Sequence, residues 1–164
     1  MLAGILLLSG TAFGTVIRRA SLTEYVAQST VIVHAVVLKT TPVFPERGMP
    51  HTIVELAVLD WVKSDPEGRL SGTTLQVLVP GASDGITTST VAESPAFAEA
   101  DEVVLFLYRH PERGHLLING LSQGTYRVFR QGTAPVLITG LHAEKDESIE
   151  AFKSRVRKLA TETR

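Results

Sequence analysis

The stretch that most restricts the fold of this chain runs from Asp101 to Arg130. It contains three short apolar runs rich in β-branched and aromatic residues, Val103–Tyr108, Leu116–Ile118 and Tyr126–Phe129, and its prolines and glycines stand only between them. Apolar runs separated by turn residues are typical of consecutive β-strands. The sequence therefore predicts a three-strand meander at the centre of a small β domain.

Length and composition are those of one folded domain. The chain has 164 residues, of which 44% are hydrophobic and 20% charged, enough to bury a core of its own. The formal net charge of −1 provides no overall field that attracts nucleic acid or anionic lipid. The chain has no cysteine, which excludes disulfides, thiolate metal sites and a cysteine nucleophile.

The first residues predict export. Leu2–Phe13 is apolar and uncharged, and Ala12 and Gly14 place small residues at positions −3 and −1 of a cleavage after Gly14. This pattern is typical of a secretory signal peptide, here residues 1–14, although no Lys or Arg precedes the run. The run is shorter than the roughly 20 residues of a membrane-spanning helix. We therefore expect a secreted, periplasmic or cell-envelope protein without an integral membrane span. The alternative interpretation of the apolar run is a buried strand or helix at the N-terminus of the fold.

Two helices are expected, one at each end of the domain. Ser21 and Glu24 have the spacing of a capping box and predict a short helix after them. Residues 146–161 predict a C-terminal amphipathic helix with Ser148 as its N-cap. Its apolar residues at helical spacing are Ile149, Phe152, Val156 and Leu159. The basic residues on its other faces are Lys153, Arg155, Arg157 and Lys158.

Between the helices, β-branched runs predict further strands. The expected strands are Thr30–Lys39, Thr52–Lys63, Thr73–Val79, Ile86–Ala92 and Val136–Thr139. Thr30–Lys39 is almost wholly apolar, which indicates cover on both faces, and its His34 is expected to be a hydrogen-bonded core residue. A helix remains the alternative for Thr52–Lys63. Strands of this number and length predict a mainly β fold, a small antiparallel OB-like barrel over residues 20–140.

Two connections are candidates for a binding surface, because functional residues favour loops on a rigid scaffold. Thr41–His51 contains three prolines and a glycine and is expected to be an exposed loop. Pro80–Gly85 is expected to be a tight loop. The candidate binding residues in these two connections are Pro42, Phe44, Pro45, His51, Ser83 and Asp84.

No sequence motif predicts a catalytic or metal site. The chain lacks a G-x-S-x-G elbow, an H-E-x-x-H pair, a phosphate-binding loop and a calcium loop, so no cofactor is expected. His110 and His115 flank one turn, and a metal-dependent or hydrolytic domain centred on them is an alternative function. Four arginines stand near aromatic residues, as on surfaces that bind single-stranded nucleic acid: Arg109, Arg113, Arg127 and Arg130. Ordinary surface arginines without nucleic acid are the preferred interpretation.

Three local patterns resemble an uncharacterised family of bacterial exported domains. The first is SLTEYVAQSTVIVHAVVL at residues 21–38. The second is P-x-F followed by an acidic pair and a V-L-F-L strand, at Pro95–Leu107, and the third is G-L-x-Q-G-x-aromatic-x-V, at Gly120–Val128. Their order is also distantly similar to the netrin-like, OB-type barrel of metalloproteinase inhibitors. If the mode of contact is shared, the resemblance implies a contact surface made by Pro42–His51 and Pro80–Gly85.

The chain departs from both patterns at several positions. Thr30 stands where an acidic residue is expected, and Ala35 and Ala100 stand where glycines are expected. The inhibitors also use an N-terminal cysteine to chelate the catalytic zinc, and this chain has none. The prediction is therefore an exported, non-enzymatic domain that binds another protein, with an association with proteases implied by the resemblance. A structural accessory module of the cell envelope is a further alternative.

Overall fold

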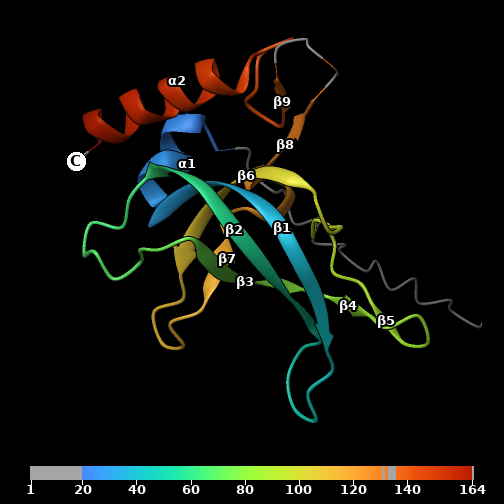
Figure 1. The fold of residues 1–164 in the computed structure, drawn as a ribbon. Coiled ribbons are helices and arrows are strands. Elements are labelled where there is room, and N and C mark those ends of the chain that lie inside the picture. Colours follow the sequence, from blue (N-terminus) through green and yellow to red (C-terminus); the bar gives the residue numbers. More distant parts are fainter. Residues whose placement is uncertain (1–19, 131, 133–135, 164) are drawn as a thin grey trace, which may run out of the picture.

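Strands dominate the fold, and two helices pack together at one end of it (Figure 1). The computed structural model describes residues 20–130, 132 and 136–163, so the predicted signal peptide at residues 1–14 lies outside the described residues. In chain order the elements are α1 (Leu22–Gln28), β1 (Val31–Val43), β2 (His51–Lys63), β3 (Thr74–Pro80), β4 (Ala82–Ser83), β5 (Thr88–Ser89), β6 (Glu102–Arg109), β7 (Leu116–Ile118), the 3-10 helix η1 (Leu121–Gly124), β8 (Thr125–Phe129), β9 (Leu137–Thr139) and α2 (Ile149–Glu162).

Five strands close into a barrel. They follow the order β1-β2-β3-β7-β6, and β6 pairs back with β1 along Val31–Val36. The pairs are antiparallel apart from β3 and β7, which run parallel at Val77 and Leu78. The predicted mainly β fold, a small barrel with a short helix before it and a C-terminal helix after it, is confirmed. Thr52–Lys63, which is compatible with helix or strand in sequence, lies in the strand β2.

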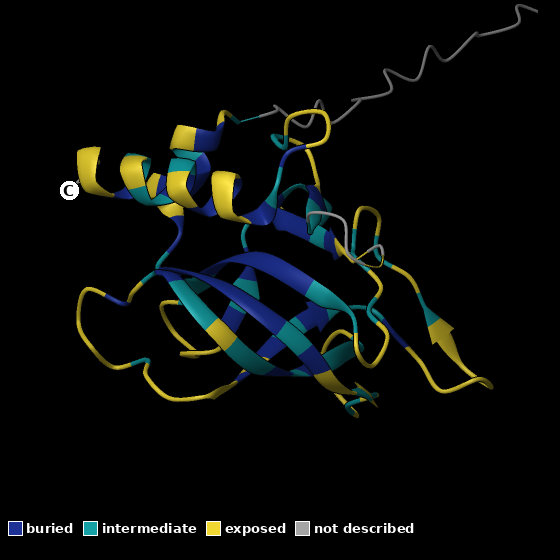
Figure 2. Ribbon diagram, turned by 45° about the horizontal axis from the view of Figure 1, so that its top comes forward, coloured by how far each residue is buried: buried dark blue, intermediate teal, exposed yellow. Residues whose placement is uncertain are grey.

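The first half of β1 is buried on both faces. Val31 and Val33 belong to the hydrophobic cluster inside the barrel, whereas Ile32 belongs to the cluster beneath the helices. Successive side chains of a strand point to opposite faces, so one apolar run contributes to two cores. Figure 2 shows the burial of the barrel strands, in dark blue and teal. The prediction of cover on both faces is confirmed for this half of the strand.

The helices cover an outer face of the sheet. Phe152 of α2 is fully buried beside Phe106 and Tyr126, with ring centroids 6.5 and 4.7 Å away. α1 begins with the predicted capping box, in which Ser21 accepts from the Glu24 N–H and the Glu24 carboxylate accepts from the Ser21 N–H. Helix α2 begins one residue after Ser148, its predicted N-cap.

The predicted three-strand meander is wrong in its pairing. β7 pairs with the last residues of β6 and β8 with its first residues, so both lie along the edge of β6 that faces away from β1. The chain passes from one to the other through η1, which packs on α1. There Tyr25 donates a hydrogen bond to Gln123 at 2.9 Å, and its ring lies so close to Gly120 that a Cβ there would collide with it. This tertiary contact redirects the chain between the two strands.

The first predicted loop is shorter than expected. β1 continues through Val43 and β2 begins at His51, so residues 44–50 form the loop and the predicted bounds Thr41–His51 are wrong. Pro42 fits the strand because this part of β1 pairs only with β2, and proline is tolerated on an edge.

The predicted edge strand Ile86–Ala92 is wrong apart from Thr88–Ser89. These two residues pair with Ala82–Ser83, which lie inside the expected tight loop Pro80–Gly85, and together they form a separate two-stranded sheet. The pairing ends early because the hairpin projects from the barrel and is largely exposed, so no core supports a longer strand (Figure 2).

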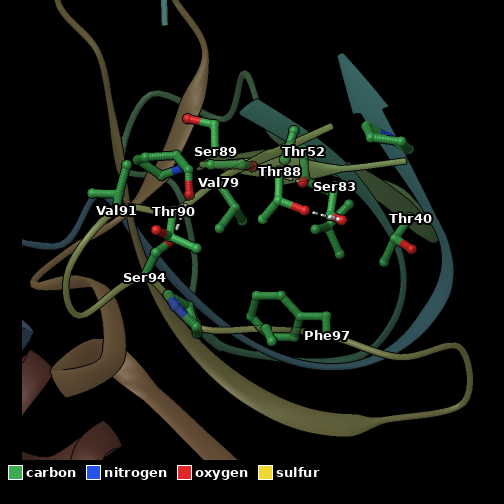
Figure 3. Close-up of a pocket in the computed structure, with 17 residues that line it drawn as sticks. Thr40, Thr52, Val79, Ser83, Thr88, Ser89, Thr90, Val91, Ser94 and Phe97 are labelled. Atoms are coloured by element: carbon green, nitrogen blue, oxygen red, sulfur yellow. Dashed lines mark hydrogen bonds between the residues drawn. The ribbon is translucent and has the colours of Figure 1, made fainter. Parts of the chain in front are cut away.

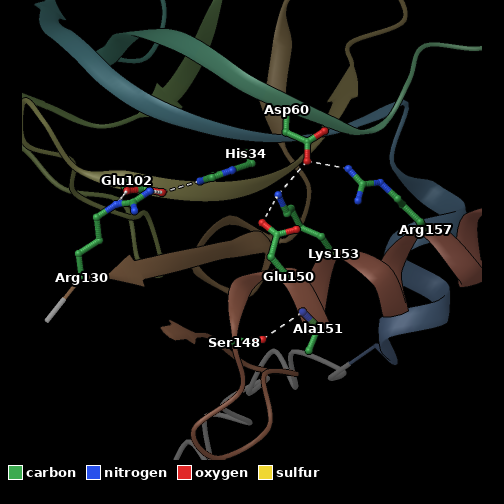
Figure 4. Close-up of polar contacts among 9 residues, drawn as sticks. All are labelled: His34, Asp60, Glu102, Arg130, Ser148, Glu150, Ala151, Lys153 and Arg157. Carbon is green, nitrogen blue, oxygen red and sulfur yellow. Dashed lines mark hydrogen bonds and ion pairs between the residues drawn. The ribbon is translucent and has the colours of Figure 1, made fainter. Parts of the chain in front are cut away.

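The basic side chain of Lys153 predicts a position on a solvated face of α2. In the structure Lys153 is buried. Its ammonium group donates to Asp60 Oδ2 at 2.9 Å and lies 2.7 Å from Glu150 Oε1 (Figure 4). Arg157 donates to the same oxygen of Asp60 at 2.6 Å. The buried charge is thus paired on both sides, which joins α2 to β2.

His34 is buried and hydrogen-bonded, as predicted for a core histidine. Its Nε2 lies 2.7 Å from Glu102 Oε1, across the pairing of β1 with β6 (Figure 4). Arg130 donates two hydrogen bonds to the same carboxylate, at 2.6 and 2.7 Å. Glu102 therefore links three strands, β1, β6 and the end of β8.

Replacing Phe152 by alanine tests how much the helix contributes to stability. We expect Phe152→Ala to lower the free energy of unfolding by about 3–5 kcal/mol, because a fully buried ring is lost and a cavity remains. Urea unfolding followed by circular dichroism measures the change. Lys158→Ala, at an exposed position of the same helix, is the control and should change stability by less than about 0.5 kcal/mol. A loss below about 1 kcal/mol for Phe152→Ala would contradict this packing.

Three carboxyl groups predict how stability depends on pH. Burial alone would raise the pKa of Asp60, Asp101 and Glu102, but hydrogen bonds and neighbouring cations hold each pKa below its ordinary value. A group with a depressed folded-state pKa stabilises the fold above its unfolded pKa, and this contribution is lost as the pH falls through the folded-state pKa. We expect the free energy of unfolding to decrease as the pH is lowered below about 4.

Urea unfolding at a series of pH values measures this dependence. Asp60→Asn should reduce the slope of the free energy of unfolding against pH, because one of the three carboxyl groups no longer titrates. Glu46→Gln, at an exposed carboxyl that makes no ion pair among the described residues, should keep the wild-type slope. A free energy of unfolding that stays constant from about pH 5 to pH 2 would rule out this stabilisation by the three carboxylates.

Candidate functional site

The end of the barrel opposite the helices carries both predicted binding loops (Figure 1). The 44–50 loop joins β1 to β2, and the segment after β3 leads into the hairpin of β4 and β5. They meet where His51 pairs with Pro80 and where the Gly81 N–H donates to the Pro50 carbonyl at 2.9 Å. The structure therefore brings the two loops together, and we call this region the loop end.

Two clefts lie at the loop end, and Pro80 lines both of them. The first, the hydroxyl cleft, has a volume of about 300 Å³ and is lined by the predicted residues Pro42 and Ser83. The second, the arginine cleft, has a volume of about 400 Å³ and is lined by the predicted residues Pro45 and His51. Phe44 and Asp84 line neither cleft. The predicted residues thus share one end of the barrel but do not form a single site.

The hydroxyl cleft is uncharged. Its polar side chains surround the ring of Phe97 (Figure 3), and they are those of Thr40, Thr52, Ser83, Thr88, Ser89, Thr90 and Ser94. Two of these hydroxyls bind the backbone: Thr52 donates to the Gly81 carbonyl at 2.8 Å, and Ser94 donates to the Pro80 carbonyl at 2.6 Å. Ser83 Oγ lies 2.9 Å from Thr88 Oγ1, a hydroxyl that cannot act as its general base. Among the described residues that line this cleft there is no His, Lys, Asp or Glu that could act as a base for one of these hydroxyls.

Asp84 stabilises the turn between β4 and β5. Its carboxylate accepts hydrogen bonds from the N–H groups of Thr87 and Ile86, at 2.6 and 2.9 Å, and these bonds lower its pKa. The turn in consequence holds Ile86 at its tip, with 95% of that side chain's surface exposed. Met49, in the 44–50 loop, is 61% exposed. The loop end thus presents large apolar side chains to solvent.

The arginine cleft lies beneath the 44–50 loop. Ile53 of β2 and Leu78 of β3 line its floor, while Arg47 of the loop lines it from one side. Arg113 and His115 line it from the turn between β6 and β7. The turn that carries the alternative histidine site therefore meets the predicted binding loop at a single cleft.

His110 and His115 have different surroundings. The backbone N–H of His110 donates to the His115 carbonyl at 2.8 Å, and His110 Nδ1 accepts from the N–H groups of Glu112 and Arg113, both at 3.3 Å. His110 thus closes the turn, and His115 alone of the pair lines the cleft. Among the described residues, no three His, Cys, Asp or Glu side chains are grouped so that they could hold a metal ion.

Most of the arginines near the aromatic residues bind a carboxylate or carbonyl group of the same chain. Arg127 lies 2.9 Å from Asp101 Oδ2, and Arg130 binds Glu102. Arg109 donates to the Gly114 carbonyl at 3.3 Å. The sequence prediction missed that Arg113 shares a cleft with Arg47, because no pattern links two loops so distant along the chain.

The chain matches no family model, and no curated protein is found to be similar to it in sequence. Within residues 20–130, 132 and 136–163, no helix is long and apolar enough to span a membrane.

Removing the Asp84 carboxylate should loosen the hairpin locally. In Asp84→Ala we expect the amides of Ile86 and Thr87 to exchange with deuterium roughly five- to tenfold faster, because both lose their acceptor. Exchange measured residue by residue by NMR provides the readout, and the amides of β6 are the internal control. Unchanged exchange at Ile86 and Thr87 would show that the carboxylate does not hold the turn.

Proposed function

We propose that this protein is an exported, non-enzymatic interaction domain that binds another protein through the loop end. The observation that carries the proposal is the exposure of Phe44 and Met49 in the 44–50 loop and of Ile86 at the tip of the hairpin that follows the Pro80–Gly81 contact with this loop. Large apolar side chains on neighbouring exposed loops are typical of surfaces that are covered by a partner.

The surroundings of these side chains support the same function. Two clefts, of about 300 and 400 Å³, lie beside the loops and can receive side chains of a partner. The barrel beneath them is closed and packed, so the loops stand on a rigid base. A preorganised surface loses little conformational entropy on binding, which favours affinity.

A protein partner agrees better with the charges than a nucleic acid does. Arg127 and Arg130, beside the aromatic residues of β8, bind Asp101 and Glu102 of the same chain. These two cations are therefore already neutralised and are less available to phosphates.

Export and a protease-associated role rest on the sequence. The apolar run within residues 1–14 supports export, and the resemblance to the netrin-like inhibitors supports contact through the same two loops. An exported protease is accordingly a partner class that fits the proposal. Because the chain has no cysteine, such contact would not use a thiolate ligand to the protease's zinc.

Site-specific crosslinking tests the proposed surface. A photoreactive amino acid at Met49 or Ile86 of the full chain should crosslink to the same partner protein in an envelope extract of the native cells. The matched control is Leu59, which is 53% exposed but lies on β2, next to the Asp60 that binds α2. Adducts from both loop positions and none from Leu59 are expected. No adducts, or the same adduct from all three positions, would exclude the loop end as the binding surface.

A second measurement uses the captured partner. Met49→Ser with Ile86→Ser should weaken binding at least about tenfold, because two apolar side chains are no longer buried in the complex. Both positions are exposed, so the melting temperature should stay at its wild-type value.

A further inference from the structure

We infer that the arginine cleft selects the partner by binding an extended, acidic segment in which carboxylate side chains flank an apolar residue. This inference rests on the proposed function and names the chemistry of the segment that the loop end recognises.

Two arginines differ from all others in the described part of the chain. The arginines whose side chains make a hydrogen bond or an ion pair are Arg69, Arg109, Arg127, Arg130, Arg155 and Arg157. Among the described residues, the side chains of Arg47 and Arg113 make neither. Both line the same cleft, although they belong to loops far apart in sequence.

The charges around these two guanidinium groups favour an anion. No Asp or Glu is among the residues that line the cleft, whereas His51 and His115 are. Glu46 and Glu112, next to the arginines in sequence, are exposed, do not line the cleft and make no ion pair among the described residues. A guanidinium group is a planar fork of donors that matches a carboxylate with two parallel hydrogen bonds. The cleft thus lacks the acidic groups that pair with most of the other described arginines.

The floor of the cleft favours a peptide over other anions. Its apolar lining is made by Pro45, Met49, Pro50, Ile53, Val77, Leu78, Pro80 and Leu116. A free phosphate would contact the arginines and leave this lining uncovered. No Phe, Tyr or Trp ring lines the cleft, so a nucleic acid would find none of the large aromatic platforms on which single-stranded bases usually stack. A segment with an apolar side chain between acidic ones covers both the floor and the rim.

The open edge of β3 favours an extended segment. β3 pairs with β7 at only Val77 and Leu78, so within the described residues the rest of that edge is without a neighbouring strand. Gln76 lies on it and lines the cleft. A segment in extended conformation can pair with such an edge while its alternate side chains enter the cleft.

A peptide array tests the inference with the full chain as the soluble component. The array carries randomised hexapeptides, and a matched set in which serine is replaced by phosphoserine. We expect retained peptides to be enriched in Asp or Glu next to an aliphatic residue. Retention should decrease between about 0.05 and 0.5 M salt, because exposed charges are screened over about 8 Å at physiological ionic strength.

Charge reversal identifies the residues responsible. Arg47→Glu with Arg113→Glu should lower the affinity for the best acidic hexapeptide roughly tenfold or more, and Arg47→Lys with Arg113→Lys should retain part of it. Arg69→Glu, at an exposed arginine outside the cleft, is the matched control and should bind as the wild type does. Neither Arg47 nor Arg113 binds another side chain within the described part of the chain, so thermal unfolding should be unchanged and confirm that the variants fold.

Several results would overturn the inference. They are a wild-type array without acidic preference, a preference that survives the double charge reversal, and retention of phosphopeptides alone. In each case the crosslinks from Met49 and Ile86 still report on the loop end, so the proposed function can stand while the acidic segment is rejected. If instead those crosslinks are absent, the proposed function itself fails.

Discussion

The pairing of β1 with β6 is the contact on which the rest of the structure depends. It joins Val31–Val36 to β6 and turns the sheet into a barrel, which removes two open edges at once. The same six residues supply side chains to the barrel interior and to the cluster beneath the helices. Beyond Val37 the strand has only β2 as a neighbour, so the hairpin extends past the barrel and carries the 44–50 loop away from both cores. The closure of the barrel and the projection of the 44–50 loop therefore both depend on where the pairing of β1 with β6 ends.

The two ends of the barrel differ because the helices close only one of them. There, Lys63 of β2 donates to the carbonyls of Val26 and Ser29 at 2.7 and 2.6 Å, which satisfies the C-terminal end of α1. Lys153 of α2 is buried against Asp60. Charges at this end thus attach the helices to the sheet, although Leu59 of β2 is still 53% exposed beside Asp60. Among the described residues no helix covers the opposite end, which carries the exposed side chains of Met49 and Ile86 and both clefts.

The features that could be predicted from the sequence depend on neighbours in the chain. The capping box of Ser21 and Glu24, and the helical spacing around Phe152, are local signals, and both helices lie where they indicate. The pairing of β7 and β8 with one edge of β6 could not be predicted, since it follows from Tyr25 packing against the turn after β7. The burial of Lys153 in α2 likewise depends on the carboxylate of Asp60, which lies in the distant strand β2. For the candidate site, the sequence indicates two loops, which the structure brings to one end of the barrel, but it does not indicate that their residues line two different clefts that share Pro80.

The two unpaired arginines are compatible with a stable fold because they are exposed. A guanidinium group in water keeps its hydration, so Arg47 and Arg113, which have no side-chain partner among the described residues, cost the free protein little. When a partner segment covers the apolar floor of the cleft, water is displaced and the local dielectric constant falls. An ion pair formed there is stronger than it would be on the free surface, and a mismatched group leaves two charges without compensation. In the proposed complex the apolar side chains of the loop end and the two arginines would thus depend on each other: the former would exclude water, and the latter would then discriminate between partners.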